Sequence, residues 1–366
     1  MTQRSAPDVG DLAPIRERID AVDARLLELL AERADLVAAI ADAKRASGLS
    51  TVDPERENLL LRKVLERGAG RFPREAIVAV FRAIMSASVS LQASVSVAYL
   101  GPAGTFSHLA ARTLFGYAPR YLETVTIEGV FDAVRTGSAS YGVVPFENST
   151  EGSVAGVIEG LLVGGLFIRR EVVLPIEHCL MGRATSLLEV ERVYSHPQGL
   201  AQCREWLHRN VPRAQLVHTD STAAAAREAR RDTAGAAIGS TVAAELQGLD
   251  VLASRIQDHA GNETRFVMIG TERARPTGDD KTTIVFAIKD EESRGALRRI
   301  LALIDEAGVN MTRIESRPRR GAAWRYLFVV DVEGHADDPP VAAAIARLEE
   351  RCEGVTVLGS YPRYPR

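Results

Sequence analysis

The sequence predicts a multidomain protein with an all-α N-terminal part, an α/β middle part and an α+β C-terminal part of ferredoxin-like type. Apolar residues recur at helical spacing up to residue 92. From residue 95, short β-rich runs alternate with helical runs. After residue 281 the order is strand, helix, strand, strand, helix, strand. A chain of 366 residues is long enough to hold two or three such domains.

Composition narrows the class of protein. The formal net charge is −3, which argues against a nucleic-acid-binding surface spread over the whole chain. Cys179, Cys203 and Cys352 are far apart and lack metal-ligand spacing, so buried thiols in a reducing compartment are expected. No apolar leader opens the sequence, and no stretch is apolar enough to span a bilayer. We therefore expect a soluble, cytoplasmic protein without a membrane partner.

One long helix is predicted to start the N-terminal part. Its apolar positions step by four and three residues along one face, and neither Gly nor Pro interrupts it before Gly48. The helix should be about 50 Å long at about 1.5 Å per residue. In "STVDPEREN" (50–58), Asp53 suits an N-cap and Pro54 the first position of a second helix. A third helix is predicted from near Pro73. The apolar face of the first helix consists of Ile15, Ile19, Val22, Leu26, Leu29, Leu36 and Ile40.

Cations interrupt this apolar face. Arg33 occupies a position where an apolar residue is expected, and Lys44 returns to nearly the same face three turns later. Ser88 and Gln92 extend the apolar row of the third helix. Buried cations are costly unless paired, so these two either pair with an acid such as Glu57 or line a pocket for an anion. Two cations beside two uncharged polar residues favour the pocket.

Arg16 points to a homodimer. It lies 28 residues before Lys44, which is about 42 Å along the helix and too far for one small ligand. A second copy running antiparallel would bring the two side chains together. It would also cover an apolar face that so small a domain cannot bury alone. We therefore expect sites that are completed by two chains.

These residues resemble, in type and spacing, the active-site set of the all-helical chorismate mutases. The resemblance implies an intertwined helical dimer that rearranges chorismate to prephenate. That pericyclic reaction needs positioning and charge stabilisation rather than a nucleophile. By the resemblance, Lys44 and Gln92 donate to the ether oxygen. Arg33 and Arg16 (from the other chain) bind the carboxylates, and Glu57 binds the hydroxyl. The full set is Arg16, Arg33, Lys44, Asp53, Arg56, Glu57, Ser88 and Gln92.

The middle part carries Ser or Thr at five junctions where a strand is followed by a predicted helix, and Ser107 is predicted to cap the first. Helix N-termini favour carboxylates, and in open α/β sheets they gather at the carboxyl ends of the strands. No GxGxxG is present and no Lys-Ser/Thr follows Gly104, so a small dianion is expected rather than a nucleotide cofactor. The predicted strands are Val95–Leu100, Tyr141–Phe146, Val190–Ser195, Gln215–Thr219, Ala236–Gly239 and Phe266–Gly270.

The segments "GPAGTFSHLAA", "VPFENSTEGSV", "SHPQGLAQC" and "GNETRF" resemble the ordered motifs of prephenate dehydratases over residues 96–271. The resemblance implies two α/β lobes, similar to periplasmic-binding-protein lobes, with the active site in the cleft. The family converts prephenate to phenylpyruvate with loss of water and carbon dioxide. By the resemblance, Thr264 helps the 4-hydroxyl to leave and Arg265 pairs with anionic groups in the same cleft. Other implied substrate-site positions are Glu147, Asn148, Ser195 and Gln202.

The C-terminal part resembles ACT regulatory domains of prephenate dehydratases, marked by Gly295–Ala296–Leu297 and Glu315–Ser316–Arg317–Pro318. The resemblance implies that two such domains pair and bind free phenylalanine at their interface, which inhibits the dehydratase. Backbone groups beside Gly295 and Asn310 could hold both ends of the amino acid. The implied effector residues are Gly295, Ala296, Leu297, Asn310, Glu315 and Ser316. A small packing domain is the alternative.

Together the three parts resemble the bifunctional chorismate mutase–prephenate dehydratases of phenylalanine biosynthesis, with predicted domains at 1–94, 95–278 and 279–366. The parts agree chemically, because the first product is the second substrate. No cofactor or metal is expected, since the chemistry needs none and the histidines lack ligand spacing. Two alternatives remain. One is a dehydratase for prephenate or arogenate whose helical part only dimerises, and the other is an amino-acid-sensing regulator without enzymatic activity.

Overall fold

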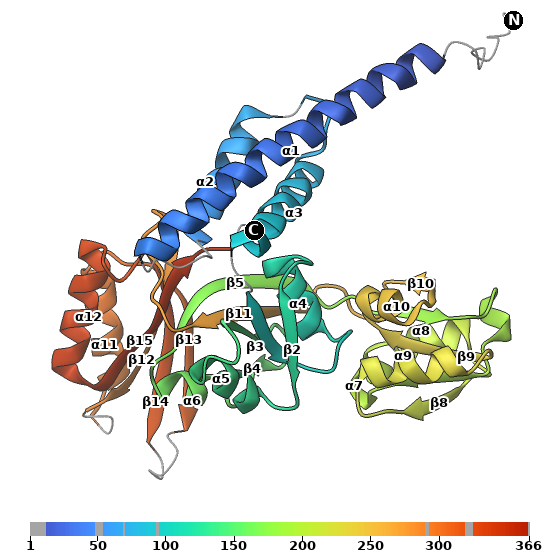
Figure 1. Cartoon of the computed structure of the whole chain (residues 1–366). Coiled ribbons are helices and arrows are strands. Elements are labelled where there is room, and N and C mark those ends of the chain that lie inside the picture. Colours follow the sequence, from blue (N-terminus) through green and yellow to red (C-terminus); the bar gives the residue numbers. More distant parts are fainter. Residues whose placement is uncertain are drawn as a thin grey trace, which may run out of the picture.

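The computed structural model describes residues 12–47, 54–68, 70–92, 95–289, 293–318 and 325–364. Three helices lie above a two-lobed α/β region, and a four-stranded sheet with two helices stands beside the first lobe (Figure 1). This arrangement confirms the predicted multidomain class, and it places the C-terminal part against the first lobe and away from the second.

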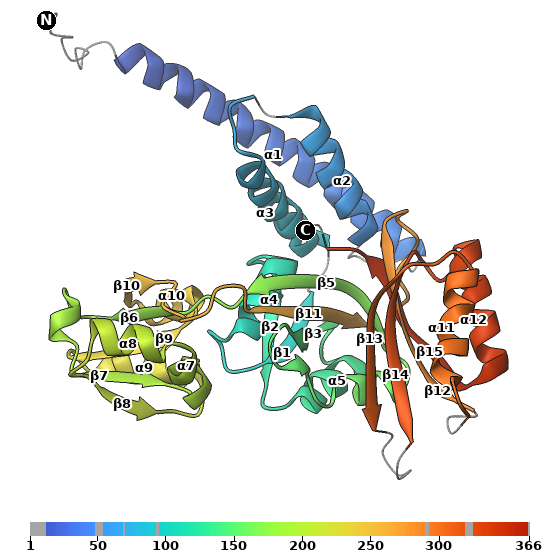
Figure 2. The same cartoon turned by 180° about the vertical axis from the view of Figure 1, so that it is seen from behind.

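The N-terminal part is built from α1 (Ala13–Ser47), α2 (Pro54–Arg67) and α3 (Arg74–Gln92). The second helix begins at Pro54 as predicted, because proline suits the first helical position. With 35 residues, α1 is about 52 Å long, and its N-terminal half projects beyond the other two helices (Figures 1 and 2). Of its described side chains, only Val37 and Ala41 are buried hydrophobics. The predicted apolar face is therefore present and largely open, with Ile15, Ile19, Val22, Leu26, Leu29, Leu36 and Ile40 each more than half exposed.

The first lobe is built around a sheet with the order β2-β1-β3-β11-β5. The short strand β4 pairs with the C-terminal end of β3. Strand β11 is antiparallel to both of its neighbours, while β1, β2 and β3 run parallel. The strands are β1 (Ser96–Leu100), β2 (Arg120–Thr124), β3 (Tyr141–Asn148), β4 (Gly152–Ser153), β5 (Phe167–Pro175) and β11 (Glu263–Gly270). The helices are α4 (Phe106–Phe115), α5 (Ile127–Arg135) and α6 (Val157–Leu162).

The second lobe has a sheet with the order β10-β6-β9-β7-β8. The chain enters this lobe after β5 and returns through β11, so two connections join the lobes, as expected for a binding-protein-like pair. Its strands are β6 (Cys179–Gly182), β7 (Arg192–Ser195), β8 (Gln215–His218), β9 (Gly235–Gly239) and β10 (Asp250–Ser254). Its helices are η2 (Leu187–Glu189), α7 (Pro197–Gln202), α8 (Arg204–Asn210), α9 (Thr222–Arg231) and α10 (Thr241–Gln247).

At five junctions the sequence predicted a helix that begins at a Ser or Thr, and three of these junctions differ in the structure. Helix α4 is capped by Thr105, and Ser107 lies buried in its first turn because the helix begins earlier than predicted. "ENSTEGSV" continues into β4 and not into a helix. His196 caps α7 in place of a serine. Ser221 and Ser240 cap α9 and α10 as predicted.

The C-terminal sheet, formed by β12–β15, has the order β13-β14-β12-β15 and the predicted ferredoxin-like element order. One of its faces packs on α11 and α12. Its other face, through Val285, Val329 and Leu358, joins the core of the first lobe. Because the sheet is covered on both faces, nearly all of β12 is buried, including the polar residues Asp280, Thr282 and Thr283. The elements are β12 (Asp280–Ile288), α11 (Ala296–Glu306), β13 (Met311–Pro318), β14 (Tyr326–Glu333), α12 (Pro339–Arg351) and β15 (Cys352–Pro362).

Candidate active sites

Thr264 lies within β11, directly opposite Asn148 on β3. The sequence predicted that this strand starts at Phe266, two residues later. The strand instead starts at Glu263, because the backbone and side chain of Ser149 pair with that residue. Thr264 is 7% exposed, and its Oγ1 accepts a hydrogen bond from Asn148 Nδ2 at 2.9 Å. The hydroxyl is thus held in one place at the end of the sheet.

The orientation of the Asn148 amide follows from its other contacts. Its Oδ1 accepts hydrogen bonds from the backbone N–H groups of Thr150 at 3.0 Å and Glu151 at 3.1 Å. Backbone N–H groups can only donate, so the oxygen must face them and the NH₂ group must face Thr264. Because the hydroxyl oxygen of Thr264 accepts from this NH₂ group, its own proton is available to a group in the cleft.

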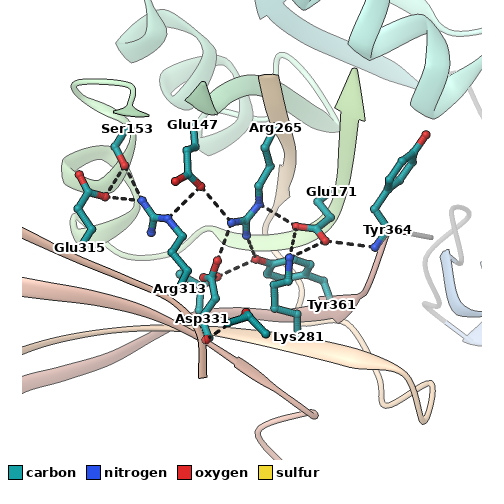
Figure 3. Close-up of polar contacts among 12 residues, drawn as sticks. Glu147, Ser153, Glu171, Arg265, Lys281, Arg313, Glu315, Asp331, Tyr361 and Tyr364 are labelled. Atoms are coloured by element: carbon teal, nitrogen blue, oxygen red, sulfur yellow. Dashed lines mark hydrogen bonds and ion pairs between the residues drawn. The ribbon is translucent and has the colours of Figure 1, made fainter. Parts of the chain in front are cut away.

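The prediction that Arg265 faces the same cleft as Thr264 is wrong. Adjacent residues of a strand point to opposite faces of the sheet. Arg265 is 8% exposed, and its guanidinium lies against Glu171 and Asp331 inside the protein (Figure 3). Glu147 lies on the same side, with its Oε2 2.9 Å from Nε of Arg313 on β13. The structure therefore brings Thr264 and Asn148 together and separates both from Arg265 and Glu147.

The second lobe contributes Ser195 and Gln202, both predicted from sequence. Ser195 is fully buried at the end of β7 and donates to the backbone carbonyl of Ile238 at 3.2 Å. Gln202 Oε1 lies 2.8 Å from Nε2 of His178. Burial lowers the pKa of His178, partly opposed by the hydrogen bond to Gln202, so the ring is neutral near pH 7.

Direct contacts join the two lobes. Ser240 Oγ donates to the carbonyl oxygen of Gly104 at 2.7 Å, and the ring of Phe106 meets that of His178 edge to face at 5.5 Å. Gly104 has a positive φ of 97°, and a Cβ there would lie 3.2 Å from Cα of Ala243 in the second lobe. Glycine therefore permits both the turn and the close approach of the lobes.

The helical part brings two of its predicted residues together. Arg33 on α1 is partly buried, and its Nη1 donates to the hydroxyl of Ser88 on α3, which in turn donates to the carbonyl oxygen of Ile84 at 2.7 Å. Arg16 and Arg56 are exposed. The remaining predicted residues lie outside the described residues or side chains: Asp53, and the side chains of Lys44, Glu57 and Gln92.

The predicted effector residues fall into two groups within one chain. Gly295 has a positive φ of 73° and caps α11, next to Ala296 and the partly exposed Leu297. Asn310 follows the other end of this helix, whose 11 residues span about 16 Å. Glu315 and Ser316 lie toward the Gly295 end of this helix. Ser316 on β13 pairs with Phe328 of β14, and so does Phe286, which lies near the end of β12 that leads to Gly295. One chain therefore does not bring Gly295 and Asn310 to one amino acid.

Several residues of these sites gave no signal in the sequence. Asp331, Tyr361 and Arg313 meet β3 and β11 only because the C-terminal sheet packs on the first lobe. Glu171 is the exception: it follows Arg169 and Arg170 in β5, and this run of three charged residues between apolar residues was the available signal. Among the described residues, no cluster of three or more His, Cys, Asp or Glu could hold a metal ion. In the same part of the chain, no helix is long and apolar enough to cross a membrane.

Family models match three successive parts of the chain. Chorismate mutase type II matches residues 15–93, Prephenate dehydratase matches residues 97–274, and the ACT domain matches residues 282–350. The matches follow the order of the helical part, the two lobes and the C-terminal sheet.

Known proteins are similar to this chain over most of its length. A bifunctional chorismate mutase/prephenate dehydratase of Aquifex aeolicus (strain VF5) is 43% identical over 357 residues, 96% of this chain and 98% of that protein. Prephenate dehydratase of Arthrobacter aurescens, solved in complex with L-Phe, is 37% identical with a TM-score of 0.67, over 74% of this chain and 90% of that one. GqqA, described as a novel type of quorum quenching acylase, is 33% identical with a TM-score of 0.67, over 74% and 98% of the two chains. The chain therefore belongs to the family of bifunctional chorismate mutase/prephenate dehydratases.

Proposed function

We propose that this chain converts chorismate to prephenate in its helical part and prephenate to phenylpyruvate in its two-lobed part. We further propose domain boundaries near residues 94 and 278, and free phenylalanine as the ligand of the C-terminal domain. The single observation that carries the dehydratase assignment is the Thr264 hydroxyl, which accepts from Asn148 and keeps its own proton available.

The dehydration needs help mainly at the departing oxygen. As the ring carboxylate leaves as carbon dioxide, the electrons of its C–C bond form the new ring π bond. The C–O bond at the 4-position breaks, and the oxygen takes that electron pair with it. Thr264 donates a hydrogen bond to this oxygen as negative charge grows there. A threonine hydroxyl is a very weak acid, so it stabilises the departing hydroxide and does not transfer its own proton. The bond that it accepts from Asn148 strengthens it as a donor.

The mutase site requires a second copy of the chain in this proposal. Arg33 already meets Ser88 of its own chain, whereas Arg16 lies 17 residues earlier on the same helix. That separation is about 26 Å, more than one chorismate can bridge. An antiparallel partner would bring its own Arg16 to Arg33 and would bury the open apolar face of α1. We therefore propose a homodimer or larger homo-oligomer, with Lys44, Glu57 and Gln92 completing the site.

Phenylalanine sensing requires a second copy for a similar reason. Gly295 and Asn310 lie at opposite ends of α11, so one amino acid meets both groups only between two chains. The L-Phe bound by the Arthrobacter aurescens protein supports the choice of ligand. Prephenate and arogenate are distinguished by comparing kcat/KM for the two substrates.

The assignment of two activities is tested with Arg33→Ala. We expect the variant to lose chorismate consumption and to keep dehydration of added prephenate, because the two sites share no residue. Arg71→Ala is the control, since Arg71 is exposed in the turn between α2 and α3. A wild-type mutase rate in Arg33→Ala would contradict the mutase assignment. It would favour a helical part that only dimerises.

A further inference from the structure

Strands β3 and β11 carry two kinds of polar residue on two faces. Thr264 and Asn148 are paired in register, and so are the adjacent Arg265 and Glu147. Because side chains alternate along a strand, the first pair points to one face and the second to the other. The next residue on the Arg265 face, Val267, packs in a core that includes residues of the C-terminal sheet. The strand that holds Thr264 thus carries on its opposite face residues that contact this sheet.

Arg265 is bound on several sides by buried partners (Figure 3). Its Nη1 donates to Asp331 Oδ2 at 2.6 Å, its Nε lies 2.7 Å from Oε2 of Glu171, and its Nη2 donates to the hydroxyl of Tyr361. Asp331 is 1% exposed and Tyr361 is fully buried. Asp331 is the carboxylate of the C-terminal sheet on this buried guanidinium, so its loss would leave Arg265 with Glu171 of the first lobe and would weaken the link between strand and sheet.

Asp331 and Tyr361 are themselves fixed by the C-terminal sheet. Thr283 on β12 donates to Asp331 Oδ1 at 2.7 Å, which uses its only proton. The hydroxyl of Tyr361 therefore donates to Thr283, also at 2.7 Å. Burial would raise the pKa of Asp331, but Arg265 beside it holds that pKa below its ordinary value, so the carboxylate stays charged. Three strands of the sheet thereby share in holding Arg265.

We propose that Arg265 is a positioning residue through which the C-terminal sheet sets the position of Thr264, and that the Arg265–Asp331 pair carries the effect of an amino acid bound to that sheet. The inference rests on the proposed function. Arg265 acts through the backbone of β11, since its side chain lies on the face opposite Thr264 and is 8% exposed. A shift of the sheet would move Arg265 and with it the neighbouring hydroxyl, so the effector changes turnover more than substrate binding.

The test measures how strongly phenylalanine changes dehydratase kinetics in the full-length protein. Asp331→Asn removes one of the two carboxylates closest to Arg265 and leaves Glu171, and Tyr361→Phe removes one hydroxyl while keeping the ring. For each, kcat and KM for prephenate are measured with and without saturating phenylalanine. The effect of phenylalanine is expressed as kcat without phenylalanine divided by kcat with phenylalanine. We expect this ratio to fall by about fivefold or more from its wild-type value, since allosteric couplings span roughly 5–150-fold. Glu159→Gln is the matched control, because Glu159 on α6 meets Arg317 of the same sheet at 3.6 Å without touching β11.

The outcomes separate this inference from the proposed function. A wild-type ratio in both folded variants, with wild-type circular dichroism and thermal midpoints as the check of folding, would overturn the inference. An equal loss in Glu159→Gln would overturn it too, because it would show general loosening of the interface. If Asp331→Asn does not fold, Tyr361→Phe alone decides. A wild-type enzyme without any response to phenylalanine would defeat the proposed sensing function itself.

Discussion

Replacing Thr264 with valine tests the proposed role of its hydroxyl with little change in shape. Valine removes the oxygen that accepts from Asn148 Nδ2 at 2.9 Å. That NH₂ group keeps its bonds to Asn262 Oδ1 at 2.8 Å and to the carbonyl oxygen of Glu263 at 3.3 Å. Because the donor remains satisfied, the loss in unfolding free energy should be about 1 kcal/mol, the net worth of one neutral hydrogen bond.

The expected catalytic loss is much larger. Removing one preorganised hydrogen-bond donor to a developing oxyanion costs about 10²–10³-fold in kcat, or about 3–4 kcal/mol. Thr264→Val should therefore lower kcat for prephenate by that factor while its thermal midpoint falls by only about 2–4 °C. Phenylpyruvate formation, followed by its ultraviolet absorbance, gives the rate.

Thr264→Ser is the matched control, since it keeps the hydroxyl and deletes only a methyl group. We expect its kcat to stay within about tenfold of wild type, because serine can donate the same hydrogen bond. A valine variant with kcat within about threefold of wild type would refute the hydroxyl's role. Equal losses in both variants, with equal losses of stability, would show that position 264 matters for packing and not for catalysis.

Three further predictions concern docking, pH and assembly. Gly359→Ala places a Cβ 2.2 Å from the carbonyl oxygen of Ile168, so unfolding in urea should show a loss of about 1–3 kcal/mol, and an unchanged midpoint would contradict this contact. Burial lowers the pKa of His178, so below about pH 6.5 the unfolded state binds more protons than the folded state. The free energy of unfolding should therefore fall as the pH drops below about 6.5, and it should fall less in His178→Gln. Leu26, 52% exposed, lies on the apolar face of α1. Leu26→Glu should therefore shift the sedimentation mass toward the monomer, whereas an unaltered mass would count against the helical dimer.

The helical part was the most predictable region, because its signals are local. The spacing of apolar residues and the proline at position 54 gave α1 and the start of α2. The same spacing also identified a face that the single chain leaves open. That observation could be made from sequence because a helix repeats its faces every few residues.

The two faces of β11 were missed because the predicted strand began too late. Starting the strand at Phe266 left Thr264 and Arg265 outside it, where the alternation of side chains does not apply. Once the strand starts at Glu263, the two side chains must point apart. Asp331 could not have been predicted as the partner of Arg265, because 66 residues separate them and only the packing of two domains brings them together.

In the proposed function, one chain performs two consecutive reactions under the control of its C-terminal domain. The most direct measurement supplies chorismate alone and follows prephenate and phenylpyruvate over time, with and without phenylalanine. We expect wild type to form phenylpyruvate, Thr264→Val to accumulate prephenate, Arg33→Ala to leave chorismate unconsumed, and phenylalanine to slow only the second step. If both variants formed phenylpyruvate from chorismate at the wild-type rate, the proposed roles of Thr264 and Arg33 in the two reactions would be wrong.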